Sequence, residues 1–150
     1  MDSESINLGF YGGEPTLEIP LIKKCIEYME ENKGNKDVTY SITTNATLLT
    51  DEIIDFFKQY EVEVTISLDG PKEIHNSKRI AAIDGRGSFE QVIKSLKKIK
   101  SRWEQCSEKV NFNSVMSSEY GFQIYGDFFE NTEVVKDFSA TVNLPSDIYT

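Results

Sequence analysis

The chain has 150 residues, of which 39% are hydrophobic, and a formal net charge of -9 at pH 7. This length and hydrophobic content suit a single globular domain with a real core. The acidic balance, with no compensating basic run, argues against a nucleic-acid binder or a protein of anionic membranes. Because no apolar run could span a membrane and the N-terminal residues lack a signal-peptide pattern, we expect a cytoplasmic protein.

The first predicted strand covers residues 6–10, where apolar and polar or small residues alternate. It runs into Gly12-Gly13-Glu14-Pro15, and the apolar periodicity of residues 19–29 predicts a helix directly afterwards. The two glycines would let a ligand approach the main chain, and Glu14 offers an acceptor for a cationic group. An ordinary glycine turn with a solvated Glu explains these residues, taken alone, equally well.

The same theme repeats along the chain. Further strands are predicted at residues 38–43, 62–68, 110–116 and 138–144, and further helices after Thr50, from Ser88 to Trp103 and from Phe122 to Phe129. Thr50 is a predicted N-cap, Leu49 and Ile54 form a predicted hydrophobic staple, and Ser88 with Gln91 forms a predicted capping box. Residues 72–87 show little periodicity and are predicted to be a long connector used for binding.

Strand and helix therefore alternate five times, with connections too long for hairpins, which predicts parallel strands. Such a series either closes as a (β/α) barrel or opens as a doubly wound sheet. We predict an α/β fold, a partial parallel (β/α) barrel of about five β/α units. Polar groups at Glu14, Asn45, Ser67–Asp69 and Asn113 fall at C-terminal strand ends, where a barrel places its site.

Other reactive residues point to structural roles. Neither Cys25 nor Cys106 has a second Cys or a His at ligand spacing, so no local metal site is expected. Cys25 is predicted to be a buried filler and Cys106 a surface thiol. His75, the only histidine, is predicted to lie at the surface or to order the connector. For Asp69, an Asx-type turn explains its position at least as well as a contact with ligand.

Three motifs at these strand ends belong together: Gly12-Gly13-Glu14-Pro15, then Thr44-Asn45, then Ser67-Leu68-Asp69-Gly70-Pro71 with His75 and Arg79 beyond it. They resemble the radical S-adenosylmethionine (radical SAM) enzymes, in the branch of anaerobic sulfatase maturases and ribosomal-peptide maturases with auxiliary-cluster (SPASM or twitch) domains. The resemblance covers nearly the whole chain. It implies S-adenosylmethionine as cofactor and, in the parent enzyme, a peptide or protein substrate and a [4Fe-4S] cluster.

The resemblance also implies a cofactor-binding role for seven residues. Gly12, Gly13 and Glu14 would accept hydrogen bonds from the ammonium of the cofactor's methionine moiety, and Arg79 would pair with its carboxylate. Ser67 would contact the ribose or the carboxylate, and Asn45 and Asn113 would supply amide contacts. An amide that simply fills the barrel interior explains Asn113 about equally well.

The sequence departs from the family pattern in its cysteines. Family members carry a Cys-x3-Cys-x2-Cys loop after the first barrel strand, and these thiolates hold the [4Fe-4S] cluster. This sequence contains only Cys25 and Cys106. We therefore expect residues 1–150 to be a partial radical SAM core domain, strands two to six of the barrel, without the first strand, the cluster loop and the auxiliary-cluster domain.

Two functions follow as alternatives. In the first, the chain is a piece of a radical SAM peptide or protein maturase and is inactive alone, since the cluster supplies the electron that cleaves the cofactor. In the second, it is a non-catalytic module that binds S-adenosylmethionine or a peptide and acts with a partner. A third reading is a folded or partly folded α/β fragment with no function, whose exposed first-strand edge would favour self-association.

Overall fold

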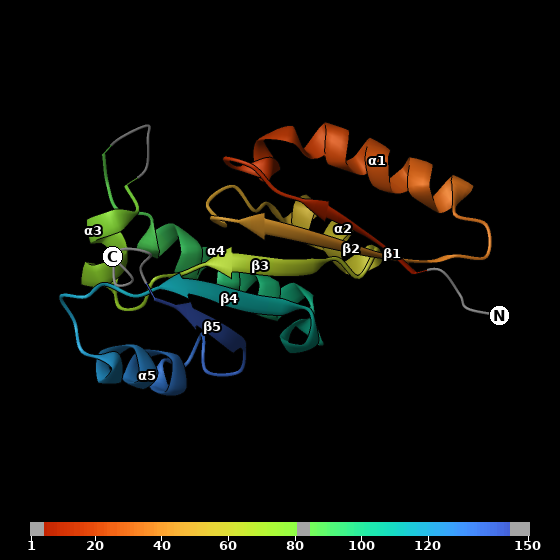
Figure 1. The fold of residues 1–150 in the computed structure, drawn as a ribbon. Coiled ribbons are helices and arrows are strands. Elements are labelled where there is room, and N and C mark those ends of the chain that lie inside the picture. Colours follow the sequence, from red (N-terminus) through yellow and green to blue (C-terminus); the bar gives the residue numbers. More distant parts are fainter. Residues whose placement is uncertain (1–4, 81–84, 145–150) are drawn as a thin grey trace.

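Five parallel strands form one sheet in a computed structural model that describes residues 5–80 and 85–144. Each strand pairs with its neighbours in the sequence, so the spatial order is β1-β2-β3-β4-β5 (Figure 1). The strands are β1 (Ser5–Phe10), β2 (Asp37–Thr44), β3 (Glu63–Ser67), β4 (Val110–Val115) and β5 (Ser139–Asn143). The helices are α1 (Ile19–Asn32), α2 (Asp51–Gln59), α3 (Lys72–Lys78), α4 (Phe89–Arg102) and α5 (Phe122–Asn131), with short 3₁₀ helices η1 (Pro15–Glu18) and η2 (Cys106–Glu108).

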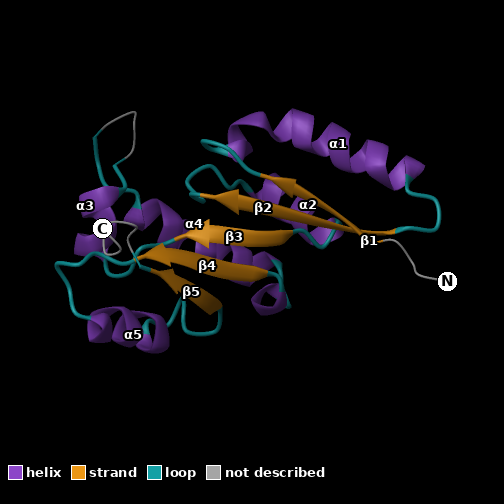
Figure 2. Cartoon of the chain, viewed as in Figure 1, coloured by secondary structure: helices purple, strands orange, loops and turns teal. Residues whose placement is uncertain are grey.

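The helices cover one face of this sheet. In Figure 2, α2 and α4 lie behind the strands, α1 runs along the β1 side and α5 along the β5 side. Successive crossovers all step in the same direction, which keeps their helices on one face. A doubly wound sheet reverses its strand order and carries helices on both faces. The predicted α/β fold with a partial parallel barrel is therefore confirmed.

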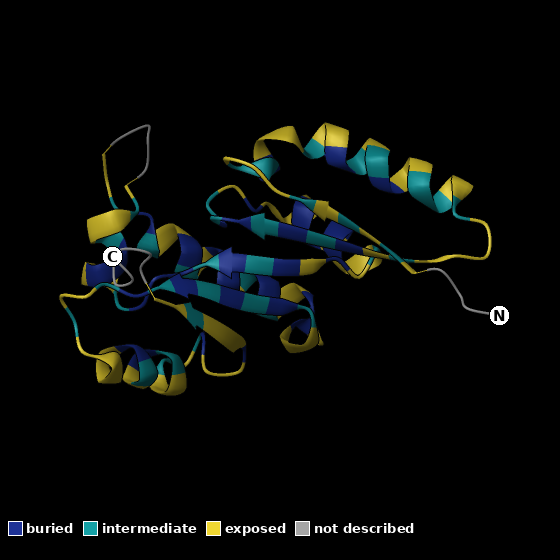
Figure 3. Ribbon diagram, viewed as in Figure 1, coloured by how far each residue is buried: buried dark blue, intermediate teal, exposed yellow. Residues whose placement is uncertain are grey.

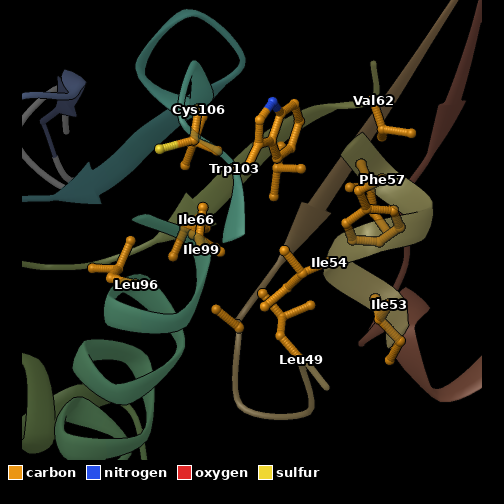
Figure 4. Packing of buried hydrophobic residues seen from close by; sticks show 14 of the residues in the cluster. Leu49, Ile53, Ile54, Phe57, Val62, Ile66, Leu96, Ile99, Trp103 and Cys106 are labelled. Carbon is orange, nitrogen blue, oxygen red and sulfur yellow. The ribbon is translucent and has the colours of Figure 1, made fainter. Parts of the chain in front are cut away.

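The core lies between this face and the helices. Alternate strand residues point into it, such as Ile42 on β2, Ile66 on β3 and Phe112 on β4, each at most 1% exposed. Figure 4 shows α2 and α4 side chains, including Ile54, Phe57, Leu96 and Ile99, gathered around Ile66 and Trp103. Each such side chain contributes about 1.5–3 kcal/mol when fully buried. Since a slip of one residue would turn this apolar set outward, burial also fixes the strand register.

The opposite face of the sheet, here called the open face, is polar. Asn7 lies beside Thr39, Thr65 beside Asn111, and Asn113 beside Thr141 in the strand register. The amide of Asn7 donates to the Thr39 hydroxyl at 2.9 Å, and the Thr65 hydroxyl donates to Asn111 Oδ1 at 3.0 Å. Among the described residues no helix covers this face (Figure 1). The Asn, Ser and Thr side chains on this face include Asn7, Thr39, Ser41, Thr43, Thr65, Ser67, Asn111, Asn113, Thr141 and Asn143.

The predicted helix starts are only partly right. Thr50 does cap α2, since its hydroxyl accepts the Ile53 N–H at 3.3 Å, and Leu49 and Ile54 are both buried in the core. The capping box of Ser88 and Gln91 is wrong, because Ser88 makes no side-chain cap bond. Instead Oδ1 of Asn76 accepts the N–H of Phe89 at 3.0 Å.

The connector prediction for residues 72–87 is wrong in its first half. Residues 72–78 form α3, which begins directly after Pro71. Pro71 ends the Asp69-Gly70-Pro71 turn and has φ -56°, close to the value that its ring imposes. Ile74 and His75 are the two buried residues of this helix. The segment therefore packs against the domain.

Strand β1 lies at one edge of the sheet. Its residues are exposed or half-buried, in contrast to β2 and β3 (Figure 3). A hollow of about 380 Å³ lies beside it, lined in part by Phe10, Leu21 and Cys25. Leu17 and Leu21 on the same side are 68% and 57% exposed. The edge that was expected to favour association is present, and association itself remains a prediction. No helix in the described part of the chain is long and apolar enough to cross a membrane.

Candidate functional site

A pocket of about 340 Å³ lies at the C-terminal ends of β1 to β4. Parallel strands end at the same edge of a sheet, and the arrowheads in Figure 1 all point to that edge. The pocket brings together all seven residues singled out from the sequence: Gly12, Gly13, Glu14, Asn45, Ser67, Arg79 and Asn113. Tyr11, Thr43, Thr44 and Val115 complete its lining.

The main chain is bare at Gly12 and Gly13. Gly12 has φ +152°, a conformation that residues with a side chain rarely adopt. A Cβ built on either glycine would meet no atom within 4 Å, so the space beside both residues is open. A ligand can therefore reach the peptide groups of this turn directly.

The carboxylate of Glu14 already holds the ends of two strands together. Its Oε1 accepts the N–H of Thr16 at 3.1 Å, which caps η1, and the hydroxyl of Thr44 at 2.6 Å. Its Oε2 accepts the N–H of Asn45 at 2.8 Å. The Thr16 hydroxyl also donates to Oε1. Since a carboxylate offers about four acceptor positions, Oε2 is the oxygen with capacity left for a cation.

The side-chain oxygen of Asn45 is occupied by hydrogen bonds within its own loop. Its Oδ1 accepts the N–H of Thr47 at 3.0 Å and the Thr47 hydroxyl at 2.7 Å. The next residue, Ala46, has φ +58°, and its carbonyl accepts the hydroxyl of Ser95 from α4 at 2.6 Å. The loop is fixed from both sides, which leaves the NH₂ group as the part of Asn45 that can donate into the pocket.

Ser67 and Asn113 lie side by side at the ends of β3 and β4. Both are half-buried and line the pocket. Oδ1 of Asn113 accepts the amide of Asn143 from β5. The amide of Asn113 thus has a structural partner within the sheet as well as a place at the pocket.

Arg79 reaches the pocket from the end of α3, paired with a buried carboxylate. Its Nε donates to Oδ2 of Asp69 at 2.6 Å, and its Nη2 to Oδ1 at 3.3 Å. The Asp69 side chain is 2% exposed, and Oδ1 also accepts the N–H of Val115 from the end of β4 at 2.9 Å. The predicted Asx-type turn at Asp69 is therefore wrong, because its carboxylate bonds to residues distant in sequence. A charge buried this deeply needs such partners.

His75 lies behind this pair and does not line the pocket. It is 0% exposed, so its predicted surface position is wrong, whereas the connector-ordering role is confirmed by its contacts. Its Nδ1 accepts the N–H of Asp69 at 3.2 Å, and its Nε2 lies 2.9 Å from the hydroxyl of Ser88. Burial lowers the pKa of His75 to about 4, outweighing the opposing charge of Asp69, so the imidazole is neutral at pH 7.

The cysteines do not fit a metal cluster. Cys106 is buried in the same cluster as Trp103 (Figure 4), not at the surface as predicted, and burial raises the pKa of its thiol. Cys25 is only half-buried, on α1. The cluster loop of the family described above supplies three thiolates, which two cysteines on different elements cannot provide. Across residues 5–80 and 85–144, no group of three or more His, Cys, Asp and Glu side chains is arranged to hold a metal ion.

The chain is similar in sequence and in fold to known proteins. The family model of the radical SAM superfamily matches residues 4–116. Radical SAM cyclopropyl synthase TigE of Paramaledivibacter caminithermalis is 30% identical over 143 residues, which are 95% of this chain and 27% of that protein. A cysteine-type anaerobic sulfatase-maturating enzyme of Clostridium novyi is 38% identical over 96 residues, which are 63% of this chain and 25% of that protein.

A solved structure shares the fold. Native anSMEcpe with bound AdoMet and Kp18Cys peptide superposes with a TM-score of 0.81 at 27% identity, over 93% of this chain and 38% of that one. The chain spans about a quarter of the length of the two curated relatives named above. The resemblance found at the strand-end motifs is thereby confirmed, and the chain belongs to the radical SAM superfamily.

Proposed function

We propose that the pocket at the strand ends binds the methionine moiety of S-adenosylmethionine, and that the protein contributes this site to a radical SAM enzyme acting on a peptide or protein. The observation that carries the proposal is the gathering of seven residues from four strand ends and α3 around one pocket of about 340 Å³. Similarity to an enzyme structure with bound AdoMet and peptide supports it.

The chemistry of the pocket suits a zwitterionic amino-acid group. The carbonyl groups of Gly12 and Gly13 and Oε2 of Glu14 are acceptors for an ammonium. The guanidinium of Arg79, whose side chain is 31% exposed, is the donor for a carboxylate, and the NH₂ group of Asn45 is a second one. The Ser67 hydroxyl and the Asn113 amide would contact the rest of the ligand.

When bound, a [4Fe-4S] cluster supplies the electron that cleaves the sulfonium of the cofactor in this family. Because Cys25 and Cys106 do not fit such a cluster, we propose that its ligands lie outside residues 1–150. On this proposal the chain is the cofactor-side part of a radical SAM core, corresponding to strands two to six of the barrel. Alone it would bind S-adenosylmethionine weakly and would not turn it over.

A nuclear magnetic resonance (NMR) titration with S-adenosylmethionine tests the site. We expect shifts at the backbone amides of Gly12, Gly13 and Asn45 and at the Arg79 side chain, with a dissociation constant on the order of a millimolar. Gly13→Ala should weaken binding at least about tenfold, because its methyl group would cover the bare turn. The space beside Gly13 is open, so this variant should keep its fold.

Gly121→Ala is the matched control. Gly121 also has open space for a methyl group but lies before α5, away from the pocket lining, so this variant should bind like the wild type. No shift at the pocket with S-adenosylmethionine at about ten times the expected dissociation constant would overturn the proposed site. Calorimetry separates the two functions, since micromolar affinity would instead favour a non-catalytic binding module.

A further inference from the structure

His75 is a buried titratable group close to the pocket that the proposed ligand contacts do not use. It does not line the pocket, and both ring nitrogens have partners. Those partners, the main chain of Asp69 and the hydroxyl of Ser88, connect the end of β3 to the start of α4.

The hydrogen bonds define which nitrogen carries the proton. The N–H of Asp69 can only donate, so Nδ1 of His75 must be an unprotonated acceptor. In a neutral imidazole the proton is then on Nε2, which donates to the Ser88 hydroxyl at 2.9 Å. A doubly protonated ring would set two donors, Nδ1–H and the Asp69 N–H, against each other.

The main chain of Arg79 is fixed by the end of α3 and by Ser88. The last helical hydrogen bond of α3 runs from the N–H of Arg79 to the main-chain carbonyl of His75 at 2.9 Å, and the Arg79 carbonyl accepts the N–H of Ser88 at 3.1 Å. The imidazole thus lies inside a closed loop of contacts between residues 69, 75, 79 and 88. Of these four residues only Arg79, which is paired with Asp69, lines the pocket.

We infer that His75 is a positioning residue whose neutral imidazole, through the main chain of Asp69, holds the Asp69–Arg79 ion pair at the mouth of the pocket. The inference rests on the proposed function only where ligand affinity is concerned. The alternative is that the ion pair and the Val115 N–H fix Asp69 without help, and that His75 merely packs against the ring of Phe89.

The wild-type chain provides the first test, because His75 is its only histidine and gives a single imidazole signal. Long-range ¹H–¹⁵N NMR spectra at pH 7 should show Nε2 protonated and Nδ1 unprotonated. A protonated Nδ1, or a ring that exchanges between both tautomers, would overturn the inference without any variant.

Two variants then separate the two ring nitrogens. His75→Asn can place an amide oxygen near the position of Nδ1 and keep the acceptor for Asp69, whereas His75→Gln reaches the position of Nε2 and keeps only the donor to Ser88. We expect the Nε–H signal of Arg79 to stay sharp and slow to exchange in H75N and to exchange at least about tenfold faster in H75Q, because one buried N–H loses its acceptor. Ile74→Val, also in α3 and buried, is the control for lost packing and should leave the signal unchanged.

Affinity for S-adenosylmethionine should follow the same order, with H75N within about threefold of wild type and H75Q at least about tenfold weaker. If wild type shows no binding, the proposed function fails, yet the Arg79 signals still decide the role of His75. Equal Arg79 signals in H75N and H75Q would overturn the positioning role, whether both are unchanged or both are lost. If neither variant folds, the inference still requires two results from the wild type: protonation of His75 on Nε2 and slow exchange of the Asp69 N–H. Failure of either result would overturn it.

Discussion

At the scale of a single residue, Glu14 combines a structural role with a proposed ligand-binding role. Its carboxylate accepts hydrogen bonds from Thr16, Thr44 and Asn45, and in the proposed site it would also receive an ammonium. The first role holds η1 and β2 against the end of β1, so that the glycine turn keeps its shape. Ligand binding depends on the structural role, because the carbonyl groups of the glycine turn point in one direction only while the turn is held in place.

Replacing Glu14 by Gln should therefore lower stability. Glutamine would replace one carboxylate oxygen by an NH₂ group, which cannot accept the hydrogen bonds that this oxygen receives in the wild type. Each half-buried N–H or hydroxyl donor that loses its acceptor in this way costs about 1–3 kcal/mol. We expect the free energy of unfolding in urea to fall by about 2 kcal/mol. Glu18→Gln nearby, at an exposed position, is the matched control and should change it by less than about 0.5 kcal/mol. Equal stability of both variants would contradict the role given to Glu14.

How far single residues could be predicted depended on the distance of their partners along the chain. Gly12, Gly13, Glu14, Asn45, Ser67 and Asn113 could be identified because strand ends can be located from periodicity and parallel strands end together. Arg79 follows α3 and came only from the family resemblance, and four further lining residues, Tyr11, Thr43, Thr44 and Val115, were not singled out as cofactor-binding. The contacts within the site could not be predicted, since Glu14 bonds to residues 30 and 31 positions away and Asp69 to one 46 positions away. The burial of His75 was missed for the same reason, as nothing adjacent in sequence indicates that Ser88 covers it.

At the scale of elements, the start of α4 depends on a contact from α3. Oδ1 of Asn76 accepts the first N–H of the helix, at Phe89. A Cβ on Gly87 would lie 1.9 Å from Cγ of Asn76. Glycine at position 87 is what allows the cap and the chain before α4 to lie so close together.

Gly87→Ala should displace Asn76 and remove this cap. A lost N-cap costs about 0.5–2 kcal/mol, so we expect a decrease of about 1–2 kcal/mol in the free energy of unfolding, measured by urea denaturation. Gly126→Ala is the opposite case, because Gly126 lies inside α5 with open space beside it. That variant should gain about 0.5–1 kcal/mol from helix propensity. If both substitutions shift stability in the same direction, the contact with Asn76 does not hold α4.

Elements with a clear apolar period were predicted nearly to the residue, and those without one were missed. Strands β2, β3 and β4 and the helices α1, α2 and α4 present buried residues to the main core, and α5 buries Tyr125 and Phe128. Helix α3 has seven residues, of which only Ile74 and His75 are buried, so no period could emerge. Cys106 was assigned to the surface because polar residues flank it, although the structure buries it in the core cluster.

For the whole molecule, the order of the strands could be predicted because each repeat adds one strand beside the previous one. The class of ligand could be predicted from motifs at the strand ends. The surfaces that would cover the two sheet edges and the open face could not be predicted, since the sequence of one chain determines only the contacts within that chain. β1 and β5 are accordingly the most exposed strands (Figure 3).

The open face has a consequence for the heat capacity of the protein. Its hydroxyl and amide groups contact water in the folded state, so unfolding newly exposes apolar surface from one face of the sheet only. A domain of 150 residues with a fully covered sheet would give a heat-capacity change of about 1.8–2.2 kcal/mol/K. We expect a value clearly below about 1.8 kcal/mol/K by scanning calorimetry at low protein concentration. A value inside the usual range would mean that the Asn, Ser and Thr side chains of the open face are buried in solution by contact with another surface.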